Sequence, residues 1–420
     1  MKIRNLLMVL ATVCISSATF ANGFQVLLQG TKAVGRGNVQ VGFRPDGSSL
    51  FFNPGALSFL ESSTVQVGVN PVFSNISYRP TGGATKHAST SPMGTPFQAY
   101  GVYRPSAESP WAFGLGVFTP FGSTVSYEDG WTGRYSLQEI SLQAIYIQPT
   151  VSYRINDVLS VGGGVDIVTG SVSFKKKVAA SGGDVGFDME GNTVQFSFNA
   201  GLYYQPSDKW SVGLNYRHGV DMAVERGDAI FDVPNDFIGD NLFGDKYTAG
   251  QPYKAAFNAT LPLPSTAAVG FGFYPNEKWS FGLDVSYVTW SVYKELKVEF
   301  PDGDYGDIAY DRSWEDSWIF NLGAEYNATD ALIVRAGAYV DTTPVPDGHM
   351  TPESPDALSI GTSVGASYMF SEKFSVDAAF LFTNKQQREN VVPTDKDTGG
   401  LNGVYKATAY IPSISLNYNF

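Results

Sequence analysis

The sequence predicts an all-β protein: an antiparallel transmembrane β-barrel of about 14 strands, with a small N-terminal plug, or hatch, in its lumen. Three observations predict this fold. Apolar residues occupy every second position in one segment after another, from about residue 63 onward. Many of these segments are long, whereas strands of soluble proteins average about 5–6 residues and tilted membrane strands need roughly 9–11. Short turns alternate with long loops, and aromatic residues follow the short turns, as an interfacial girdle requires.

Residues 1–21 have the pattern of a secretory signal peptide. Lys2 and Arg4 form a basic start, residues 6–15 form an apolar core, and Ala21 ends a cleavage site of the small-residue type. The apolar core is too short to span a bilayer. We therefore expect this segment to be removed on export.

The single cysteine, Cys14, falls inside this signal. A lipidation site is the alternative interpretation of Cys14, but the preceding residue is Val13, where a small residue would be expected. Once the signal is removed, the chain has no cysteine, so no disulfide framework can stabilise it.

Composition argues against two or three soluble domains, which a chain of 420 residues could otherwise form. Charged residues make up 16% of the chain, well below the roughly 25% usual for soluble domains. Beyond the signal no stretch offers ~20 consecutive apolar residues, which argues against a helical membrane protein. The net charge of −12 argues against nucleic acid as a partner and against an anion-selective pore.

Residues 22–62 do not fit the barrel pattern. The segment is rich in glycine and has short apolar clusters without sustained alternation. It either hangs in the periplasm or fills the lumen, because a barrel of this width would otherwise enclose an open aqueous channel. The predicted division is therefore a signal peptide at 1–21, a hatch at 22–62 and a transmembrane barrel at 63–420.

The strand beginning at Trp279 illustrates the alternation within the barrel region. One face would carry Trp279, Phe281, Leu283, Val285 and Tyr287, and the other Ser280, Gly282, Asp284 and Ser286. Similar segments begin at Trp210 and Phe374, each directly after a short turn. A soluble β-sandwich alternates as well, so strand length and loop asymmetry decide for the membrane barrel.

The connections between strands are of two kinds. Long loops are predicted at residues 179–191, 227–261, 301–312 and 384–403, and very short turns lie between them. In outer-membrane barrels the short turns face the periplasm and the longer loops face outward. This asymmetry predicts a multi-pass protein of the bacterial outer membrane.

The last predicted strand runs to an aromatic residue. Its apolar face would carry Tyr410, Ile414, Leu416, Tyr418 and Phe420, with serines and asparagines between them. Such an end resembles the signal by which the outer-membrane assembly machinery recognises its clients; a soluble strand that happens to end there is the alternative. The expected partners are thus this machinery, outer-membrane lipid and lipopolysaccharide, around a monomeric barrel.

Several blocks of the chain together resemble the FadL family of outer-membrane long-chain fatty acid and hydrocarbon transporters. The blocks are residues 22–25 (Asn-Gly-Phe-Gln), 51–57 (Phe-Phe-Asn-Pro-Gly-Ala-Leu), 263–297, 331–347 and 416–420. In that family the N-terminal segment is a hatch inside the barrel and carries an Asn-Pro-Ala motif. Here Gly55 stands between Pro54 and Ala56. The resemblance implies that Asn53, Pro54 and Ala56 belong to the gating hatch.

The resemblance also implies what the chain binds. Its cargo would be a long-chain fatty acid or another hydrophobic small molecule, which crosses by ligand-gated diffusion without covalent chemistry. Lys176 and Lys297 fall at the positions of two head-group cations of the family, and Phe24 lies in the stretch that ligand binding would shift. The alternative is that both lysines face solvent or lipid head groups at the outer rim.

A lateral opening is implied in the predicted third long strand. Gly114, Gly116, Pro120 and Gly122 lie within it. Proline cannot donate to a strand ladder and glycine weakens one, so the strand should bend and leave hydrogen bonds unmade. A gap through which cargo leaves the barrel is one interpretation, and an ordinary bulge near the rim is the other.

Nothing in the sequence suggests a catalytic residue, a metal site or a cofactor. His87, His218 and His349 are scattered without metal-site or triad spacing. The acidic loop 301–307 lacks the glutamate that closes an EF-hand loop, so a solvated loop is favoured over a calcium site.

Three other functions stay open as alternatives. A general porin for small hydrophilic solutes would need no hatch, and a surface adhesin or enzyme would use only the loops. Uptake of a neutral aromatic hydrocarbon by the same fold would need the hatch but no cation. The hatch-like blocks favour the transporters of hydrophobic molecules.

Overall fold

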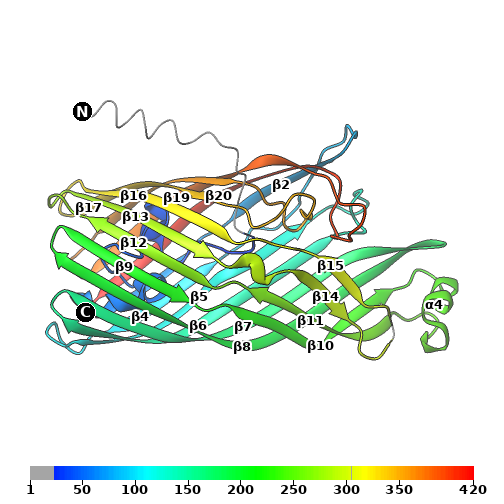
Figure 1. Ribbon diagram of the computed structural model, residues 1–420, viewed down its shortest axis with the longest axis horizontal. Helices are drawn as coiled ribbons and strands as arrows, with labels where there is room; N and C mark the ends of the chain where they lie inside the picture. Colours follow the sequence, from blue (N-terminus) through cyan, green and yellow to red (C-terminus); the bar gives the residue numbers. More distant parts are fainter. Residues whose placement is uncertain (1–22, 304) are drawn as a thin grey trace.

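A computed structural model describes residues 23–303 and 305–420 and shows an antiparallel β-barrel (Figure 1). The predicted signal peptide lies outside the described residues. Fourteen strand positions close the barrel, and several of them are filled by two shorter strands in line. In chain order the strands are β1 (Thr64–Val69), β2 (Phe73–Pro80), β3 (His87–Ala88), β4 (Phe97–Tyr103), β5 (Trp111–Ser126), β6 (Glu139–Asn156), β7 (Leu159–Ala180), β8 (Gly183–Ser207), β9 (Trp210–Arg217), β10 (Val220–Asp232), β11 (Tyr253–Leu263), β12 (Thr266–Phe273), β13 (Trp279–Val288), β14 (Glu295–Glu299), β15 (Ile308–Asp311), β16 (Ser317–Asn327), β17 (Leu332–Asp341), β18 (Ser359–Met369), β19 (Phe374–Asn390) and β20 (Gly403–Asn419). Within the described residues, no helix is both long and apolar enough to cross a membrane.

Strand β1 closes the barrel by pairing with the last strand. It pairs with β20 on one side, from Thr64 opposite Asn419 to Val69 opposite Ile414, and with β4 on the other. Closure leaves no sheet edge at this level, which is the condition for strands to cross a bilayer. The predicted all-β barrel of about 14 strands is confirmed.

Side chains alternate between the outer face and the lumen along each strand. In β13, Phe281 and Leu283 are exposed on the outer face, whereas Ser280 and Asp284 are buried inside. Asp284 lies opposite Gly270 of β12, so the lumen faces of neighbouring strands are aligned. An apolar outer face of this extent fits a lipid environment.

Aromatic residues gather on the outer face at the end of the barrel with the short turns. Trp111 packs against Tyr153 across β5 and β6 with ring centres 4.5 Å apart, and Trp279 packs against Tyr326 at 4.6 Å. Trp210 follows the turn between β8 and β9 and is exposed. These rings stand where an interfacial girdle was expected.

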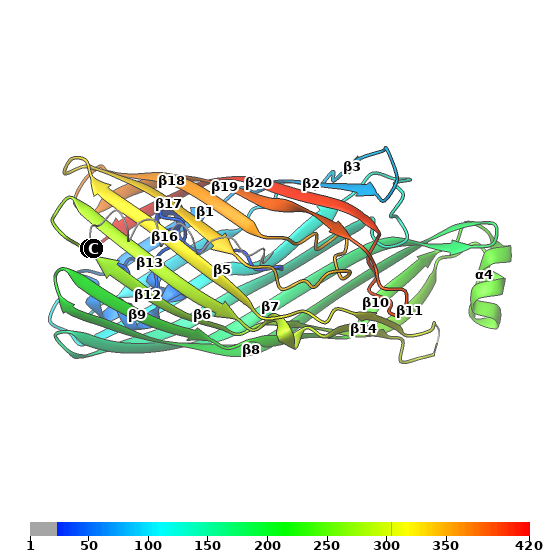
Figure 2. The ribbon, with the colours of Figure 1, turned by 45° about the horizontal axis from the view of Figure 1, so that its top comes forward.

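The strands reach much further at the opposite end, the long-loop end (Figure 2). β7 and β8 span 22 and 25 residues and are joined at Gly182 and Gly183, which both have positive φ. The predicted loop at 179–191 is therefore mostly strand. The predicted loop at 227–261 likewise contains the ends of β10 and β11 around helix α4 (Asp236–Phe243). These loop predictions were wrong because the alternation of apolar and polar residues fades where a strand extends beyond the bilayer.

Residues 23–62 lie inside the barrel (Figure 1, blue). Helix α2 (Thr31–Gly35) packs on β17, β18 and β19, whereas the 3₁₀ helix η1 (Pro54–Phe59) packs on β6, β7 and β8 at the opposite wall. Helix α3 (Ser49–Phe52) directly precedes η1 and contacts β5. The segment thus crosses the lumen from wall to wall, while its role as a hatch stays a prediction.

Glycines permit this close approach to the wall. A Cβ atom on Gly42 would lie 2.2 Å from the carbonyl carbon of Gly270 in β12. One on Gly37, where φ is +67°, would lie 2.5 Å from the backbone nitrogen of Ala338 in β17. The glycine richness of the N-terminal segment therefore has a packing cause.

Candidate functional site

A pocket in the half of the lumen toward the long-loop end, here called the apolar pocket, has a volume of about 130 Å³. Its walls come from β6, β7, β8, β10, β11, β14 and β15 and are mostly aliphatic or aromatic. They include Leu142, Val172, Phe174, Met222, Leu261 and Leu296. A concave apolar surface with a few polar groups is what a hydrophobic ligand with a polar head requires.

Phe24 reaches the apolar pocket from the N-terminal segment. Its ring stacks on Trp314 at 5.4 Å and meets Trp290 edge-on at 6.2 Å. Gly23, with φ of +54°, fits against the same two indole rings, where a Cβ atom would lie 2.6 Å from Trp314. The predicted ligand-binding residue Phe24 therefore lines the pocket, and this part of the wall comes from the first described residues of the chain.

Two cations line the apolar pocket. Lys176 donates from Nζ to the hydroxyl of Tyr310 at 3.1 Å. Arg312, which is 5% exposed, donates from Nη1 to the carbonyl of Thr398 at 3.1 Å and forms an ion pair through Nη2 with Glu353 at 3.2 Å. Within the described residues, no carboxylate oxygen lies within ion-pairing distance of Lys176. The pocket thus combines apolar walls with cationic groups able to hold a carboxylate.

Lys297 does not share this site with Lys176, contrary to the predicted pairing. Its neighbours Leu296 and Val298 line the apolar pocket, so strand alternation turns Lys297 to the other face of β14. There it is about half exposed and forms an ion pair with Glu299. Arg312 lines the pocket beside Lys176 and belongs to no motif. Its basic charge beside an aromatic cluster was the only signal for it in the sequence.

The predicted lateral opening falls on β5, but only part of it is irregular. Gly114 and Gly116 pair regularly with β4 and β6. The bulge lies between Phe118 and Phe121 and contains Pro120, and Gly122 follows it directly. Pairing with β4 also ends at Phe118, so β5 has lost its strand neighbour at this point.

Residues from the N-terminal segment stand in for the missing neighbour. The backbone N–H of Val26 donates to the carbonyl of Pro120 at 2.8 Å, and that of Gly122 donates to the carbonyl of Phe24 at 3.1 Å. Gln25 forms a β-bridge with Phe121. Residues 24–26 therefore act as a short, separate strand beside β5.

A second space, here called the wall cavity, lies beside this short strand and has a volume of about 450 Å³. It is lined by Val26, Gly122 and residues 92–96 of the connection between β3 and β4. Glu353 lines both the wall cavity and the apolar pocket. With Phe24 on the pocket and Val26 on the wall cavity, the leading residues separate the two spaces.

The loop at 342–358, between β17 and β18, holds the start of the described chain. Asp356 is fully buried and accepts hydrogen bonds from the backbone N–H of Gly23 at 3.0 Å and from Thr343 Oγ1 at 2.8 Å. Lys385 forms an ion pair with its other oxygen. The same loop carries Glu353, so one loop touches both the pocket cation and the leading residues.

The predicted hatch motif lies on the opposite side of the N-terminal segment. Asn53 caps η1 by accepting from the N–H of Gly55 at 3.1 Å, and it donates to the carbonyls of Val41 at 2.9 Å and Leu202 at 3.0 Å. Pro54 and Ala56 are buried with it. The structure therefore places these three residues at a fixed junction with β8, apart from Phe24.

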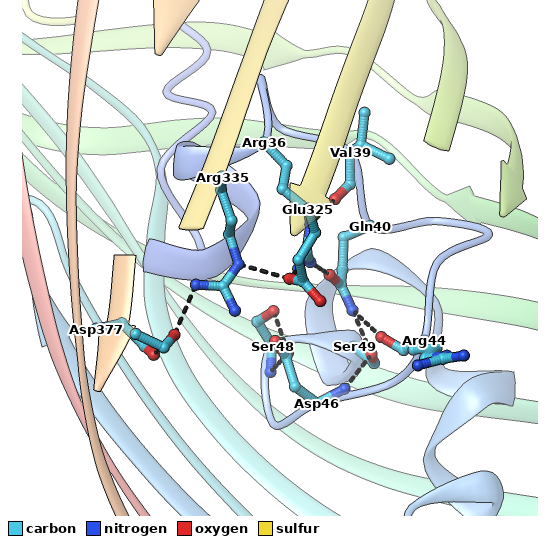
Figure 3. A network of polar contacts seen from close by, with 11 residues as sticks. Arg36, Val39, Gln40, Arg44, Asp46, Ser48, Ser49, Glu325, Arg335 and Asp377 are labelled. Carbon is cyan, nitrogen blue, oxygen red and sulfur yellow. Dashed lines mark hydrogen bonds and ion pairs between the residues drawn. The ribbon is translucent and has the colours of Figure 1, made fainter. Parts of the chain in front are cut away.

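Buried charges tie the middle of the N-terminal segment to the wall (Figure 3). Arg36 forms an ion pair with Glu325 at 2.8 Å, and Arg335 pairs with the same carboxylate at 2.6 Å. Arg335 also donates to Ser367 at 2.6 Å, and Ser367 in turn bonds Asp377. Sequence reasoning missed this network because its members come from β16, β17, β18 and β19 and share no spacing.

A second buried ion pair contacts helix α3. Arg217 forms an ion pair with Asp166 at 2.6 Å and donates to the carbonyl of Phe51 at 3.2 Å and to Gln148 at 2.9 Å. Gln148 donates to the carbonyl of Leu50 at 2.9 Å. These wall residues therefore satisfy carbonyls of helix α3 that have no partner within the helix.

Hydrogen bonds from Arg134 and Tyr135 hold the pKa of Asp184, at the start of β8, below its usual value. This ion pair is exposed and ties residues 129–137 to the tip of the longest hairpin. Within residues 23–303 and 305–420, no group of three or more His, Cys, Asp or Glu side chains is arranged to hold a metal ion.

Comparison with known proteins yields a consistent picture. The profile of a family described as "Outer membrane protein transport protein (OMPP1/FadL/TodX)" matches residues 12–420. The 47 kDa outer membrane protein of Pasteurella multocida is 26% identical over 100% of this chain and 99% of its own length. The long-chain fatty acid transport protein of Salmonella typhi is 22% identical, with 90% of each chain covered.

Solved structures share the fold. A FadL homologue from Pseudomonas aeruginosa superposes with a TM-score of 0.84 and 21% identity, covering 95% of this chain and 100% of its own. The toluene transporter TodX of Pseudomonas putida superposes with a TM-score of 0.72 and 17% identity, covering 95% of this chain and 99% of its own. At this level of identity the likeness establishes the barrel.

Proposed function

Because the chain belongs to the OMPP1/FadL/TodX family of outer-membrane transport proteins, we propose that it moves long-chain fatty acids across the bacterial outer membrane by ligand-gated diffusion, with a lateral exit through the barrel wall. Family membership makes the chain an outer-membrane transport protein and not an enzyme. The cargo and the route are the parts that we propose.

The observation that carries the proposal is a pair of cations, Lys176 and Arg312, in a pocket with apolar walls. Burying the hydrocarbon chain contributes about 0.8 kcal/mol per CH₂ group. A hydrogen bond to a charged group contributes about 1.5–3 kcal/mol. Together these groups recognise a molecule with an apolar tail and a carboxylate head.

The route follows from the two spaces beside residues 24–26. A ligand in the apolar pocket touches Phe24, and a shift of Phe24 would break the two backbone hydrogen bonds to β5. Val26 would move with it and join the apolar pocket to the wall cavity. The cargo would then leave where β5 has no strand neighbour, which supports lateral release into the bilayer.

A neutral aromatic hydrocarbon is the second candidate cargo. The volume of about 130 Å³ suits a small ring, and Phe174, Phe187, Phe257 and Tyr293 supply aromatic walls. A general porin has less support, because residues 23–62 cross the lumen from wall to wall.

Substitution of Lys176 distinguishes the two cargoes. Uptake of labelled oleate and labelled toluene would be measured in cells that lack this gene and carry either the wild-type chain or Lys176→Met. We expect oleate uptake to fall about tenfold, a loss of roughly 1.4 kcal/mol, and toluene uptake to stay unchanged.

The matched control is Lys175→Met, because Lys175 lies one position away and is absent from the pocket lining. This control should take up oleate like the wild type. Equal uptake of oleate by Lys176→Met and the wild type would contradict the fatty-acid assignment, and no uptake of either compound by the wild type would contradict the proposed function.

The other proposed partners would bind the outer face of the barrel. The outer face of β20, with Tyr410, Ile414, Leu416 and Tyr418 exposed, supports recognition by the outer-membrane assembly machinery. Lipopolysaccharide and phospholipid would surround the apolar outer face of a monomer.

A further inference from the structure

The guanidinium group of Arg312 is only partly used. Nη1 donates to the carbonyl of Thr398, Nη2 meets one oxygen of Glu353 at 3.2 Å, and Nε is buried without a hydrogen-bond acceptor. Nε and Nη2 form the edge on which a carboxylate can bind with both oxygens. Glu353 therefore binds only half of this edge, and both residues line the apolar pocket.

Glu353 also stands at the boundary of the two spaces. It lines the apolar pocket together with Arg312, and it lines the wall cavity together with Lys385 and Thr383. A Glu353 side chain that left Arg312 would thus face the hydroxyl of Thr383 and Lys385, a cation that it would share with Asp356. Its departure need not leave a carboxylate without a partner, which would be strongly unfavourable in a buried place.

The loop that carries Glu353 transmits its position to the leading residues. Ser354 donates from its N–H to the carbonyl of Thr351 at 3.0 Å, and the two residues form a β-bridge, so the turn around Glu353 is tight. Asp356 lies two residues after Ser354 and accepts from the N–H of Gly23. A shift of this turn would therefore act on the hydrogen bond that holds Gly23.

We propose that Glu353 is an internal stand-in for the cargo's head group: it neutralises Arg312 while the pocket is empty, and an incoming carboxylate displaces it and so releases Gly23 from Asp356. This inference rests on the proposed transport function and deepens it. An acid can replace Glu353 because it supplies the charge that Arg312 loses. A neutral hydrocarbon cannot, since it would leave a buried guanidinium unpaired. The pair thus makes opening of the gate depend on an anionic head.

The first test uses the unmodified chain. Purified protein in lipid vesicles would be offered oleate or oleyl alcohol, which have the same hydrocarbon chain but differ in the charge of the head. We expect oleate to be transported at least about tenfold faster, the ratio that corresponds to a preference near 1.4 kcal/mol. Equal rates for the two compounds would overturn the inference, and transport of neither would overturn the proposed function instead.

The second test replaces Glu353 by Gln, which keeps the shape and removes the charge. We expect transport of oleyl alcohol to rise about tenfold, because the alcohol no longer has to separate a buried ion pair. The matched control is Glu389→Gln, because Glu389 is an exposed residue of β19 outside both spaces. An unchanged ratio in Glu353→Gln, as in the control, would overturn the inference.

A third test does not depend on assembly of the Glu353→Gln variant, because it measures how accessible residue 26 is in a chain with Glu353 intact. The described residues contain no cysteine, so Val26→Cys supplies a single thiol beside β5. In a chain with Glu353 intact, oleate should speed modification of this thiol by a maleimide at least about fivefold, and oleyl alcohol should not. Equal effects of both compounds, or no effect of oleate, would contradict the displacement of Glu353 by a carboxylate.

Discussion

Two parts of one lumen segment are held in different ways. Residues 31–60, here called the anchored part, are tied to the wall by the buried charges of Arg36 and Arg217. Residues 23–29, here called the leading stretch, are held by single hydrogen bonds between neutral groups, by one bond to Asp356 and by the ring contacts of Phe24. The leading stretch is also the less buried of the two, because four of its seven residues are partly exposed, whereas most of residues 31–60 are buried.

The difference lies in what happens when a contact breaks. Removing one partner of a buried ion pair costs about 3–5 kcal/mol, because the other charge stays behind without compensation. A neutral hydrogen bond contributes about 0.5–1.5 kcal/mol. We therefore expect the leading stretch to detach while the anchored part stays in place, which would let the proposed passage open beside β5 without unplugging the barrel.

The largest expected effect comes from breaking an anchor. Arg217→Met should destabilise the folded barrel by about 3–5 kcal/mol, because Asp166 is fully buried and would keep a charge without a partner. The change would be measured in detergent as a shift in the guanidinium chloride concentration at which half of the protein is unfolded. We also expect steady ion conductance in planar bilayers, since helix α3 loses the groups that bind its last carbonyls.

The control for this anchor is Arg154→Met. Arg154 lies near the turn between β6 and β7. Its guanidinium donates to two exposed carbonyls at 3.4 Å and lies 5.9 Å from the ring centre of Phe59, and these three partners are all neutral. Its replacement should change the unfolding free energy by less than about 1 kcal/mol. Equal stability of the two variants would mean that the anchored part does not depend on the charge of Arg217.

The barrel and the glycine-rich lumen segment could both be predicted from the sequence. The barrel was predictable because lipid outside and polar groups inside impose a strict alternation, which survives in strands such as β13. The glycine-rich composition of the lumen segment was visible as well, since close packing against the wall requires it. Both are local properties of the chain.

The site was predictable only in part, because it is assembled from distant segments. Phe24 and Lys176 do line the apolar pocket, whereas Lys297 points to the other face of β14. The irregular turn at Trp290–Val292 precedes β14, so the alternation of β13 could not be carried forward to Lys297. Arg312 and Glu353 meet through two connections that have no periodic pattern, and sequence spacing carries no record of such a contact.

A smaller effect on stability, with a large effect on function, is expected in the leading stretch. Phe24→Ala removes the ring that packs on Trp314 and Trp290. A buried Phe→Ala substitution in a core lowers the free energy of unfolding by about 3–5 kcal/mol. Because this stretch can open locally, we expect the free energy of global unfolding to change by less than about 1 kcal/mol. Oleate binding should weaken about tenfold, because one wall of the pocket is lost.

Titration of oleate against purified Phe24→Ala and the wild type would measure this, with Phe237→Ala as control. Phe237 is an exposed aromatic residue of α4, far from the pocket lining. A large loss of global stability in Phe24→Ala would show that the leading stretch is part of the anchored structure and would remove the contrast between the two parts.

The smallest expected effect locates the boundary between the two parts. Tyr100 donates from its hydroxyl to the carbonyl of Gln29 at 2.7 Å, at the last residue of the leading stretch. Tyr100→Phe removes this one neutral hydrogen bond, worth about 1 kcal/mol, and keeps the ring. Amide hydrogen exchange should quicken about fivefold at Val26 and Leu28 and stay unchanged at Val34, because the opening energy of the leading stretch is low and separate. Equal acceleration at Val34 would place the boundary beyond helix α2, and the gate would then have to include the first anchor at Arg36.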